Sequence, residues 1–269
     1  MAISNNTEDQ LPNMVWYLAY GANMSKDVLT GRRQVKPIRS VPVRVPGYYL
    51  AFDLPGMPYI EPGFASIRSF PSDPEDSSET RFFPVTRNKR ESAPVVHGVA
   101  HLITAEDFRQ VQLTEGGGGS TEYGYQVKIV ECESYTKEKI NAHTLMSHDH
   151  CIRPSLPSLR YLTILRVGSK EHEVDPEFRE YLDDLLHFEA HSWRQKIGKY
   201  IFFMILIPIF GPILLLRGLS KKGGEGMGSI FHWWWHLLGH FIWILHDQFF
   251  EPLLGNGGSS EFQAKLKSI

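Results

Sequence analysis

Short apolar runs separated by polar turns dominate roughly the first 170 residues of the chain. Runs rich in β-branched and aromatic residues and bounded by Gly, Pro or charged residues predict strands. These runs cover residues 15–20, 43–52, 64–70, 95–103, 123–132 and 142–146. Few strands alternate strictly with helical patterns, so the pattern predicts an α+β fold, a small mostly antiparallel β-barrel with flanking helices, rather than a doubly wound sheet.

Helical patterns lie between these runs at residues 25–31 and 104–113, and a third helix is expected to begin at Asp175. Thr104 and Asp107 have the spacing of a helix-capping pair. Asp175 can cap the third helix, with Pro176 at its first position.

The last 75 residues differ in character, because long apolar segments replace the alternating pattern. Residues 200–216 read YIFFMILIPIFGPILLL, and residues 231–250 read FHWWWHLLGHFIWILHDQFF. The first segment is at the short end for a membrane span and contains Pro208 and Pro212. The two segments predict an apolar helical C-terminal extension.

Three interpretations of this extension are open. The favoured one is association with a membrane surface through residues 200–250, because tryptophan prefers the membrane interface. The second is packing on the main domain or on a second subunit, which would make a homodimer, and the third is a true span. His232, His236, His240 and His246 lie on one side of the second segment, and a polar stripe is favoured over a metal site there.

Charge and cysteine content limit the class of protein. The chain has 28 Lys and Arg against 30 Asp and Glu, a net charge of -2, which gives no basic patch expected of a nucleic-acid-binding protein. Its two cysteines cannot form a disulfide framework, and the N-terminus is polar and acidic rather than signal-like. We therefore expect a cytoplasmic protein, with membrane association through the extension.

A strand-turn-helix pattern at VWYLAYGANMSKDVL, residues 15–29, is the first candidate for chemistry. Gly21 and Asn23 tolerate positive φ, so a tight turn is expected between the strand and the helix. Backbone N–H groups at such a turn can hold an anion or an oxyanion.

Glu115 is the second candidate, because it follows the apolar Leu113 and precedes four glycines. The alternative is a solvated residue at a helix end, where glycine is the usual terminator. The glycine run lacks the Lys-Ser/Thr ending of a phosphate-binding loop. The segment AHTLMSHDHC, residues 142–151, gives only a weak indication of a metal site or a nucleophilic Cys151.

Four segments resemble the γ-glutamyl cyclotransferases in order and spacing, and together they fall within roughly the first 190 residues. They are residues 15–23, 61–70 (EPGFASIRSF), 97–117 and 153–182. The resemblance implies that the α-amine of a γ-glutamyl group attacks its own γ-carbonyl, which releases 5-oxoproline and a free amine without a metal or cofactor.

The resemblance also implies site residues. Glu115 matches the family glutamate that acts first as base and then as acid. The loop Tyr20, Gly21, Ala22, Asn23 and Met24 is expected to line the substrate cavity, with Ala22 where many members have serine. Tyr161 matches a family tyrosine at the cavity, against the alternative of a core aromatic.

The sequence thus predicts a flexible N-terminus at 1–14, a cyclotransferase-like catalytic domain at 15–197 with a mobile insertion at 71–94, the extension at 198–254 and a polar tail at 255–269. The substrate is expected to be glutathione or a glutathione conjugate. The style of the motifs resembles the filamentous-fungal branch that serves gliotoxin-type toxin biosynthesis. The competing hypothesis is a non-catalytic membrane-associated binding module.

Overall fold

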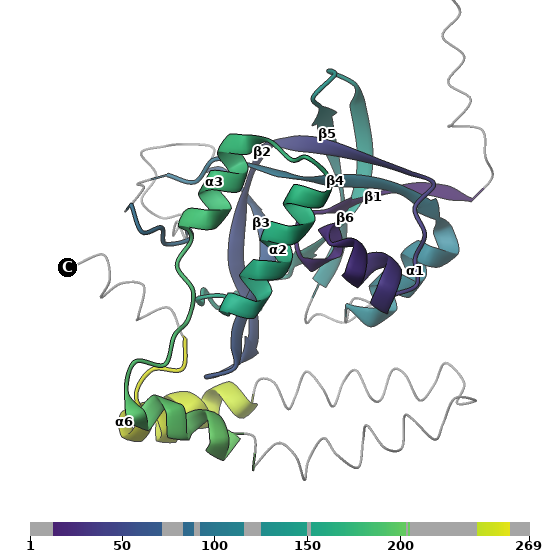
Figure 1. The fold of residues 1–269 in the computed structure, drawn as a ribbon. Helices are drawn as coiled ribbons and strands as arrows, with labels where there is room; N and C mark the ends of the chain where they lie inside the picture. The colour runs from purple at the N-terminus through teal and green to yellow at the C-terminus, as the bar shows by residue number, and fades with distance from the viewer. Residues whose placement is uncertain are drawn as a thin grey trace, which may run out of the picture.

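The computed structural model describes residues 13–71, 83–88, 92–115, 125–149, 152–202, 204 and 241–258. It consists of a β-barrel with helices against its sides, and a pair of helical segments from the C-terminal region lies beyond one end of the barrel (Figure 1). Residues 1–12 of the predicted flexible N-terminus, most of the predicted polar tail, and His232, His236 and His240 lie outside the described residues. Met14, the last residue of that predicted segment, begins the first strand.

Six strands form the barrel sheet in the order β3-β2-β4-β1-β6-β5. They are β1 (Met14–Ala19), β2 (Arg39–Met57), β3 (Glu61–Ser69), β4 (Val95–Thr104), β5 (Tyr125–Ser134) and β6 (Lys139–Ser147). Pairing of Val43 with Ser134 joins β2 to β5 and closes five strands, which leaves β3 on the outer edge of β2. Among these strands β1 and β6 pair in parallel and the others antiparallel, so the predicted mostly antiparallel barrel is confirmed.

Strand β2 is much longer than the predicted run at 43–52. Its first half pairs with β4 and its second half with β3, and the register shifts between Val45 and Tyr49. Pro46 lies in this shift and has no N–H to donate, and Gly47 has φ +83°, where a side chain would be strained. The break lets one strand bend from the barrel wall into the β2–β3 hairpin.

Three helices lie on the outside of the barrel: α1 (Ala105–Thr114), α2 (Leu159–Glu171) and α3 (Pro176–Asp184). Thr104 accepts the Asp107 N–H, and Asp175 accepts the Glu177 and Phe178 N–H groups, so both predicted caps are present. The helix predicted at 25–31 is the π-helix η3 (Asp27–Arg32), which follows the short 3-10 turn η2 (Ala22–Met24).

The main core fills the barrel and extends under α2 and α3. Leu162 and Leu165 of α2 and Leu182 of α3 are fully buried in it. A Cβ at Gly168 would lie 2.6 Å from the Ser25 backbone nitrogen, so only glycine lets α2 approach η2 so closely. Helix α2 therefore supports the loop that follows β1.

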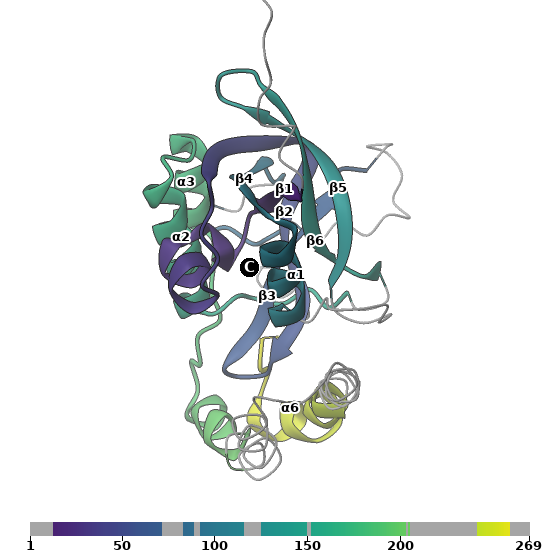
Figure 2. The same ribbon diagram turned by 90° about the vertical axis from the view of Figure 1, so that its right-hand side faces the viewer.

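The C-terminal region contributes two described helical segments, which lie side by side (Figure 2). One covers residues 193–202 and includes Met204; the other covers 241–245, η5 (His246–Phe250) and α6 (Glu251–Leu254). Tyr59, Phe202 and Ile242 form a second apolar cluster where these segments meet the β2–β3 hairpin. Helical structure in the extension is thus confirmed for its described part, and none of the described helices has the length and apolarity needed to cross a bilayer.

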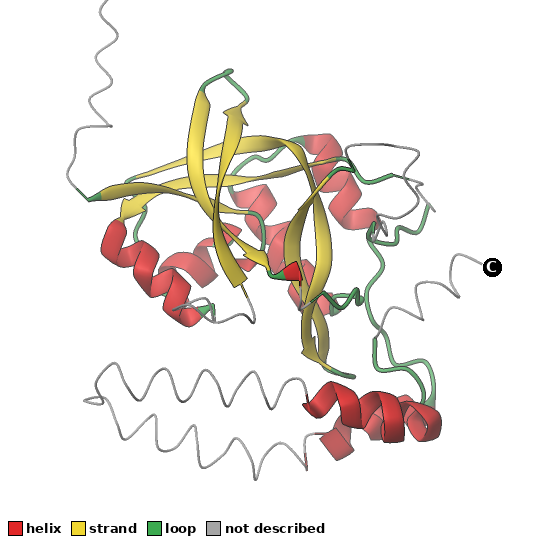
Figure 3. Ribbon diagram, turned by 180° about the vertical axis from the view of Figure 1, so that it is seen from behind, coloured by secondary structure: helices red, strands yellow, loops and turns green. Residues whose placement is uncertain are grey.

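Part of the predicted insertion at 71–94 packs against the barrel domain (Figure 3). Thr86 forms a β-bridge with Leu185 after α3, and the Leu186 N–H donates to the Val85 carbonyl at 2.9 Å. Residues 72–82 and 89–91 lie outside the described part of the chain, so the predicted mobility there stays a prediction.

Candidate active site

Glu115 is the C-terminal cap residue of α1. This helix starts where β4 ends, beside the beginning of β1, because β1 and β4 are antiparallel. Its 10 residues run back for about 15 Å, most of the length of the neighbouring strand. The Phe108 ring packs on the Tyr17 ring of β1, with centroids 5.7 Å apart. This arrangement brings Glu115 to the end of β1 from which the loop at 20–24 departs.

The Glu115 side chain is held by two donors on the same oxygen. Asn23 Nδ2 donates to Glu115 Oε1 at 2.8 Å, and Arg33 Nη2 donates to the same oxygen at 2.5 Å. Arg33 Nε also donates to Asn23 Oδ1 at 2.6 Å, and its Nη1 donates to the Thr114 hydroxyl. Among the described residues, Oε2 of Glu115 has no hydrogen-bond partner.

The open oxygen distinguishes Glu115 from the two most buried carboxylates. Asp53 accepts from Ser147 on one oxygen and from Arg68 on the other. Glu61 accepts from Ser158 on one oxygen and from Arg160 on the other. Those two carboxylates have hydrogen bonds on both oxygens, whereas Glu115, with 24% of its side chain exposed, has one oxygen that no described residue bonds.

Gly21, in the same loop as Asn23, lies against Tyr161 of α2. A Cβ at Gly21 would lie 3.0 Å from the Tyr161 hydroxyl, which leaves little room for a side chain. Gly21 has φ −111°, and Asn23 is not among the residues with positive φ, so the expected tight turn forms here without positive φ. Glycine suits this position because the loop passes so close to the Tyr161 hydroxyl.

The Tyr161 hydroxyl accepts hydrogen bonds from two backbone amides. The Ala65 N–H of β3 donates to it at 3.2 Å, and the Ala22 backbone contributes a second bond. A hydroxyl that accepts twice can still donate its proton. The only partners described for it are those two amides, so the proton has no acceptor among the described residues.

The other loop residues are positioned by the fold. The Tyr20 hydroxyl donates to the Leu145 carbonyl of β6, and the side chain is buried. The Met24 side chain is fully buried, and its N–H donates to the Gly21 carbonyl at 3.1 Å within the turn. Ala22 is half-buried. The structure thus brings together Glu115 with Asn23, and Gly21 and Ala22 with Tyr161; the role assigned to each residue stays a prediction.

Four tyrosines, three of them buried and Tyr125 half-buried, share the electrostatic environment of Glu115. Burial raises the pKa of Tyr17, Tyr20, Tyr125 and Tyr161, and the negative charge of Glu115 raises each further. Asn23 Nδ2 also bonds the Tyr17 oxygen, at 2.8 Å. These hydroxyls therefore stay neutral in the neighbourhood of the Glu115 carboxylate.

Sequence reasoning missed Arg33 and Tyr17. Arg33 has 15% of its side chain exposed and contacts both Glu115 and Asn23, whereas neighbouring Arg32 is 61% exposed and pairs with Asp27. The only sequence signal for Arg33 is its place just after the helix that follows the loop, which does not distinguish it from Arg32.

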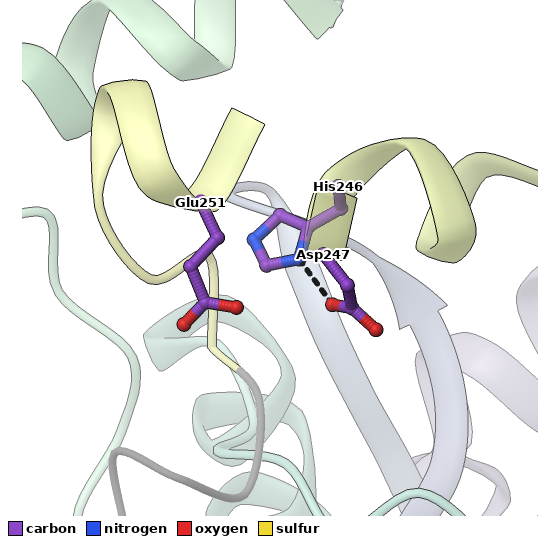
Figure 4. Close-up of side chains that lie close together, drawn as sticks. All are labelled: His246, Asp247 and Glu251. Atoms are coloured by element: carbon purple, nitrogen blue, oxygen red, sulfur yellow. Dashed lines mark hydrogen bonds and ion pairs between the residues drawn. The ribbon is translucent and has the colours of Figure 1, made fainter. Parts of the chain in front are cut away.

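One group among the described residues has the composition of a metal site, formed by His246, Asp247 and Glu251 (Figure 4). His246 Nδ1 lies 2.8 Å from Asp247 Oδ1, and His246 Nε2 accepts the Gly257 N–H at 3.0 Å. Both ring nitrogens are thus engaged, and burial lowers the pKa of this histidine. The residues fit a hydrogen-bonded clamp better than a metal centre. Of the weaker metal candidates, Asp149 pairs with Arg68, and His150 and Cys151 lie outside the described residues.

Comparison with known proteins identifies first the fold and then the family. The crystal structure of an uncharacterized protein from Homo sapiens has the same fold, with a TM-score of 0.51 and 18% sequence identity over 67% of this chain and 92% of that one. No protein-family model matches the chain.

Curated relatives define the family. Gamma-glutamyl cyclotransferase gliK of Aspergillus fumigatus is 30% identical over 250 residues, 90% of this chain and 89% of the relative. Gamma-glutamyl cyclotransferase gliK of Claviceps purpurea is 28% identical over 87% of this chain and 99% of the relative. The chain therefore belongs to the γ-glutamyl cyclotransferase family of enzymes, and the predicted family is confirmed.

Proposed function

We propose that this enzyme cyclises the γ-glutamyl group of glutathione or of a glutathione conjugate, which releases 5-oxoproline and the free amine. The observation that carries the proposal is the arrangement of Glu115, whose Oε1 is held by Asn23 and Arg33 while Oε2 has no hydrogen-bond partner in the described part of the chain. A carboxylate fixed through one oxygen and open at the other is suited to a proton transfer.

Glu115 Oε2 would remove a proton from the α-ammonium of the bound γ-glutamyl group. The amine nitrogen then bonds to the γ-carbonyl carbon and closes the five-membered ring. Both reacting atoms belong to one molecule, so the enzyme has mainly to hold the folded conformation. When the old amide bond breaks, the proton passes from Glu115 to the leaving nitrogen, and the carboxylate is regenerated. The ring nitrogen loses its second proton to water or to the released amine, which leaves the single N–H of the 5-oxoproline lactam.

Tyr161 would stabilise the negative charge that develops on the γ-carbonyl oxygen. Its hydroxyl accepts from Ala65 and Ala22, so its own proton can be directed at the substrate. Fixed donors of this kind need no reorganisation as the charge forms. In this proposal the loop at 20–24 binds the glutamyl group, with Asn23 contacting both the base and the loop.

We further propose that the physiological substrate is a glutathione conjugate in a gliotoxin-type biosynthetic pathway of a fungus. The support is the similarity to two fungal relatives that share the name gliK and match along most of the chain. The competing hypothesis of a non-catalytic binding module is disfavoured, because no described residue bonds Oε2 of Glu115, whereas a purely structural carboxylate would be expected to use both oxygens.

The test is release of 5-oxoproline by the purified full chain from glutathione, γ-glutamyl dipeptides and glutathione S-conjugates. We expect a higher kcat/KM for glutathione or its S-conjugates than for γ-glutamyl dipeptides. Glu115→Gln should lower the rate of 5-oxoproline release by about 10²-fold or more. Glu106→Gln, an exposed residue at the start of the same helix, is the matched control and should retain activity. No 5-oxoproline from any of these compounds, or full activity in Glu115→Gln, would contradict the proposal.

A further inference from the structure

The outward face of the helix at 193–202 is apolar. Trp193, Ile197, Tyr200 and Met204 are exposed by 67%, 40%, 70% and 73%. Their spacings of four, three and four residues place them within an arc of roughly 60° on a helix that turns about 100° per residue. They form one continuous stripe, which we call the outer stripe.

The helix is attached to the protein through its opposite face. Gln195 Nε2 donates to the Asn256 carbonyl at 2.9 Å, and the Phe202 ring lies 4.9 Å from the Phe250 ring. A Cβ at Gly198 would lie 3.1 Å from the Tyr59 ring, so this turn of the helix passes directly over the β2–β3 hairpin. These contacts already hold the helix, so the outer stripe is not needed to attach it.

Basic residues flank the outer stripe on both sides. By helical position, Lys196 borders it on one side and Arg194 on the other, and Lys199 lies farther round on the Lys196 side; all three are exposed. From Trp193 to residue 224 the sequence has six basic residues and no acidic residue. An apolar stripe rich in aromatic residues and edged by lysine and arginine is typical of a helix that lies in a membrane interface.

We propose that the outer stripe docks on an anionic membrane surface, with the helix parallel to the bilayer plane. Trp193 and Tyr200 would enter the headgroup region, and Lys196 and Lys199 would contact lipid phosphates or carboxylates. A second copy of the chain fits less well, because a symmetric pairing through this stripe would bring the same three cations close together. Phe241, Phe249 and Leu253 of the neighbouring segment, exposed by 53%, 58% and 67%, add apolar surface to the same helical pair.

Co-sedimentation of the full chain with vesicles tests this proposal. We expect binding to phosphatidylcholine vesicles that contain phosphatidylserine, weaker binding to phosphatidylcholine alone, and a decrease as salt is raised. The triple variant Trp193→Ser, Ile197→Ser, Tyr200→Ser should lower the partition coefficient by about 10²-fold or more. Lys196→Glu with Lys199→Glu should weaken binding to the anionic vesicles by about tenfold or more and leave binding to neutral vesicles nearly unchanged.

The matched control replaces exposed apolar residues elsewhere, Ile38→Ser with Ile129→Ser, which are exposed by 63% and 64%. This control should bind vesicles like the unmodified chain, and all variants should keep the 5-oxoproline-forming activity in solution. Absence of vesicle binding, or equal binding by the triple variant, would overturn the proposal. If the unmodified chain does not bind vesicles and the triple variant has half the mass of the unmodified chain in solution, the outer stripe is instead the contact with a second copy of the chain.

Discussion

Glu115 at the end of α1 and Asp247 in η5 each receive an arginine guanidinium, from Arg33 and Arg153 respectively. At Glu115 both donors converge on Oε1. At Asp247 the arginine binds both oxygens, at 2.9 and 2.6 Å, and His246 lies 2.8 Å from one of them. Among the described residues, the first carboxylate therefore has partners on one oxygen only, and the second has partners on both.

The surroundings of the two carboxylates explain this difference. The donors to Glu115 come from the loop after β1 and from the residue following η3, which sit beside Tyr161 and the other buried tyrosines. The partners of Asp247 belong to a clamp that fixes the extension: Arg153 stacks 4.0 Å from the Trp243 ring centre, and Trp243 Nε1 donates to the Gly56 carbonyl at 2.9 Å. The number of carboxylate oxygens that have hydrogen-bond partners distinguishes the candidate active site from the structural site. Burial and the presence of an arginine do not distinguish them as well.

Matched amide replacements give the largest expected contrast. Glu115→Gln should lower kcat by about 10²-fold or more, roughly 3 kcal/mol, because the amide cannot accept the substrate proton. Asp247→Asn should leave kcat within about twofold and lower the midpoint of thermal unfolding, because the amide NH₂ would face Arg153. Steady-state kinetics and calorimetry on both variants test the pair. Loss of activity in Asp247→Asn with retained activity in Glu115→Gln would reverse the assignment.

Most of the barrel could be predicted from the sequence, because its strands are short runs of β-branched and aromatic residues between clear turn signals. Strand β2 was predicted only at 43–52, because Pro42 before this run and Asp53, Pro55 and Gly56 after it look like strand ends, whereas the strand continues from Arg39 to Met57. Helix α2 was not predicted at all. Its sequence LRYLTILRVGSKE mixes strand-favouring residues with a helical spacing. Packing against η2 and α3 stabilises the helix over a strand.

The site was predictable to a smaller extent. Resemblance to a family identified Glu115, Tyr161 and the loop at 20–24, and the structure brings these residues into one region. Arg33 could not be found in this way, because the π-helical geometry of η3 determines which of two adjacent arginines turns toward Glu115. The bonding of both Asp247 oxygens depends on residues almost 100 positions apart, which no local pattern reveals.

Two buried histidines extend the comparison to the pH dependence of stability. Burial, with the neighbouring His172, lowers the pKa of His101 beneath the loop to about 3, while burial also lowers the pKa of His246 in the clamp. An unfolded histidine titrates near about 6.5, so the unfolded chain takes up a proton that the folded chain refuses as pH falls below that value. The contribution that the neutral buried histidines make to the free energy of unfolding is therefore fully present above about pH 6.5. It is lost as the pH decreases toward 3.

For His101 the loss of unfolding free energy amounts to roughly 2 kcal/mol between about pH 7 and pH 5. Urea unfolding at the two pH values should show a smaller loss of unfolding free energy in His101→Gln than in the unmodified chain, by about that amount. His246→Gln should give a difference of the same sign. An identical pH dependence in the unmodified chain and in His101→Gln would contradict the assignment of a neutral buried histidine.

Arg33→Met should act on turnover. It removes the donor to Glu115 and the bond to Asn23 Oδ1 together, so the carboxylate would be held by Asn23 alone. We expect kcat to fall about tenfold, roughly 1.4 kcal/mol, with a smaller change in KM, because the residue positions the base rather than the substrate. Arg33→Lys should restore part of the loss, and Arg32→Met, at the exposed neighbour, is the control. An unchanged kcat in Arg33→Met would show that Asn23 is sufficient.

Arg153→Met completes the comparison with the smallest expected effect, on stability alone. The variant loses the two bonds to Asp247 and the stacking on Trp243, but Asp247 has 40% of its side chain exposed, so water replaces part of the interaction. We expect unfolding free energy to fall by about 1 kcal/mol and kcat to stay unchanged. Proteolysis in native conditions should be faster in the extension near residues 241–258 and unaltered in the barrel. A fall in kcat comparable to that of Arg33→Met would mean that the Asp247 clamp and the Glu115 site are coupled. The distinction between a structural and a catalytic carboxylate would then be wrong.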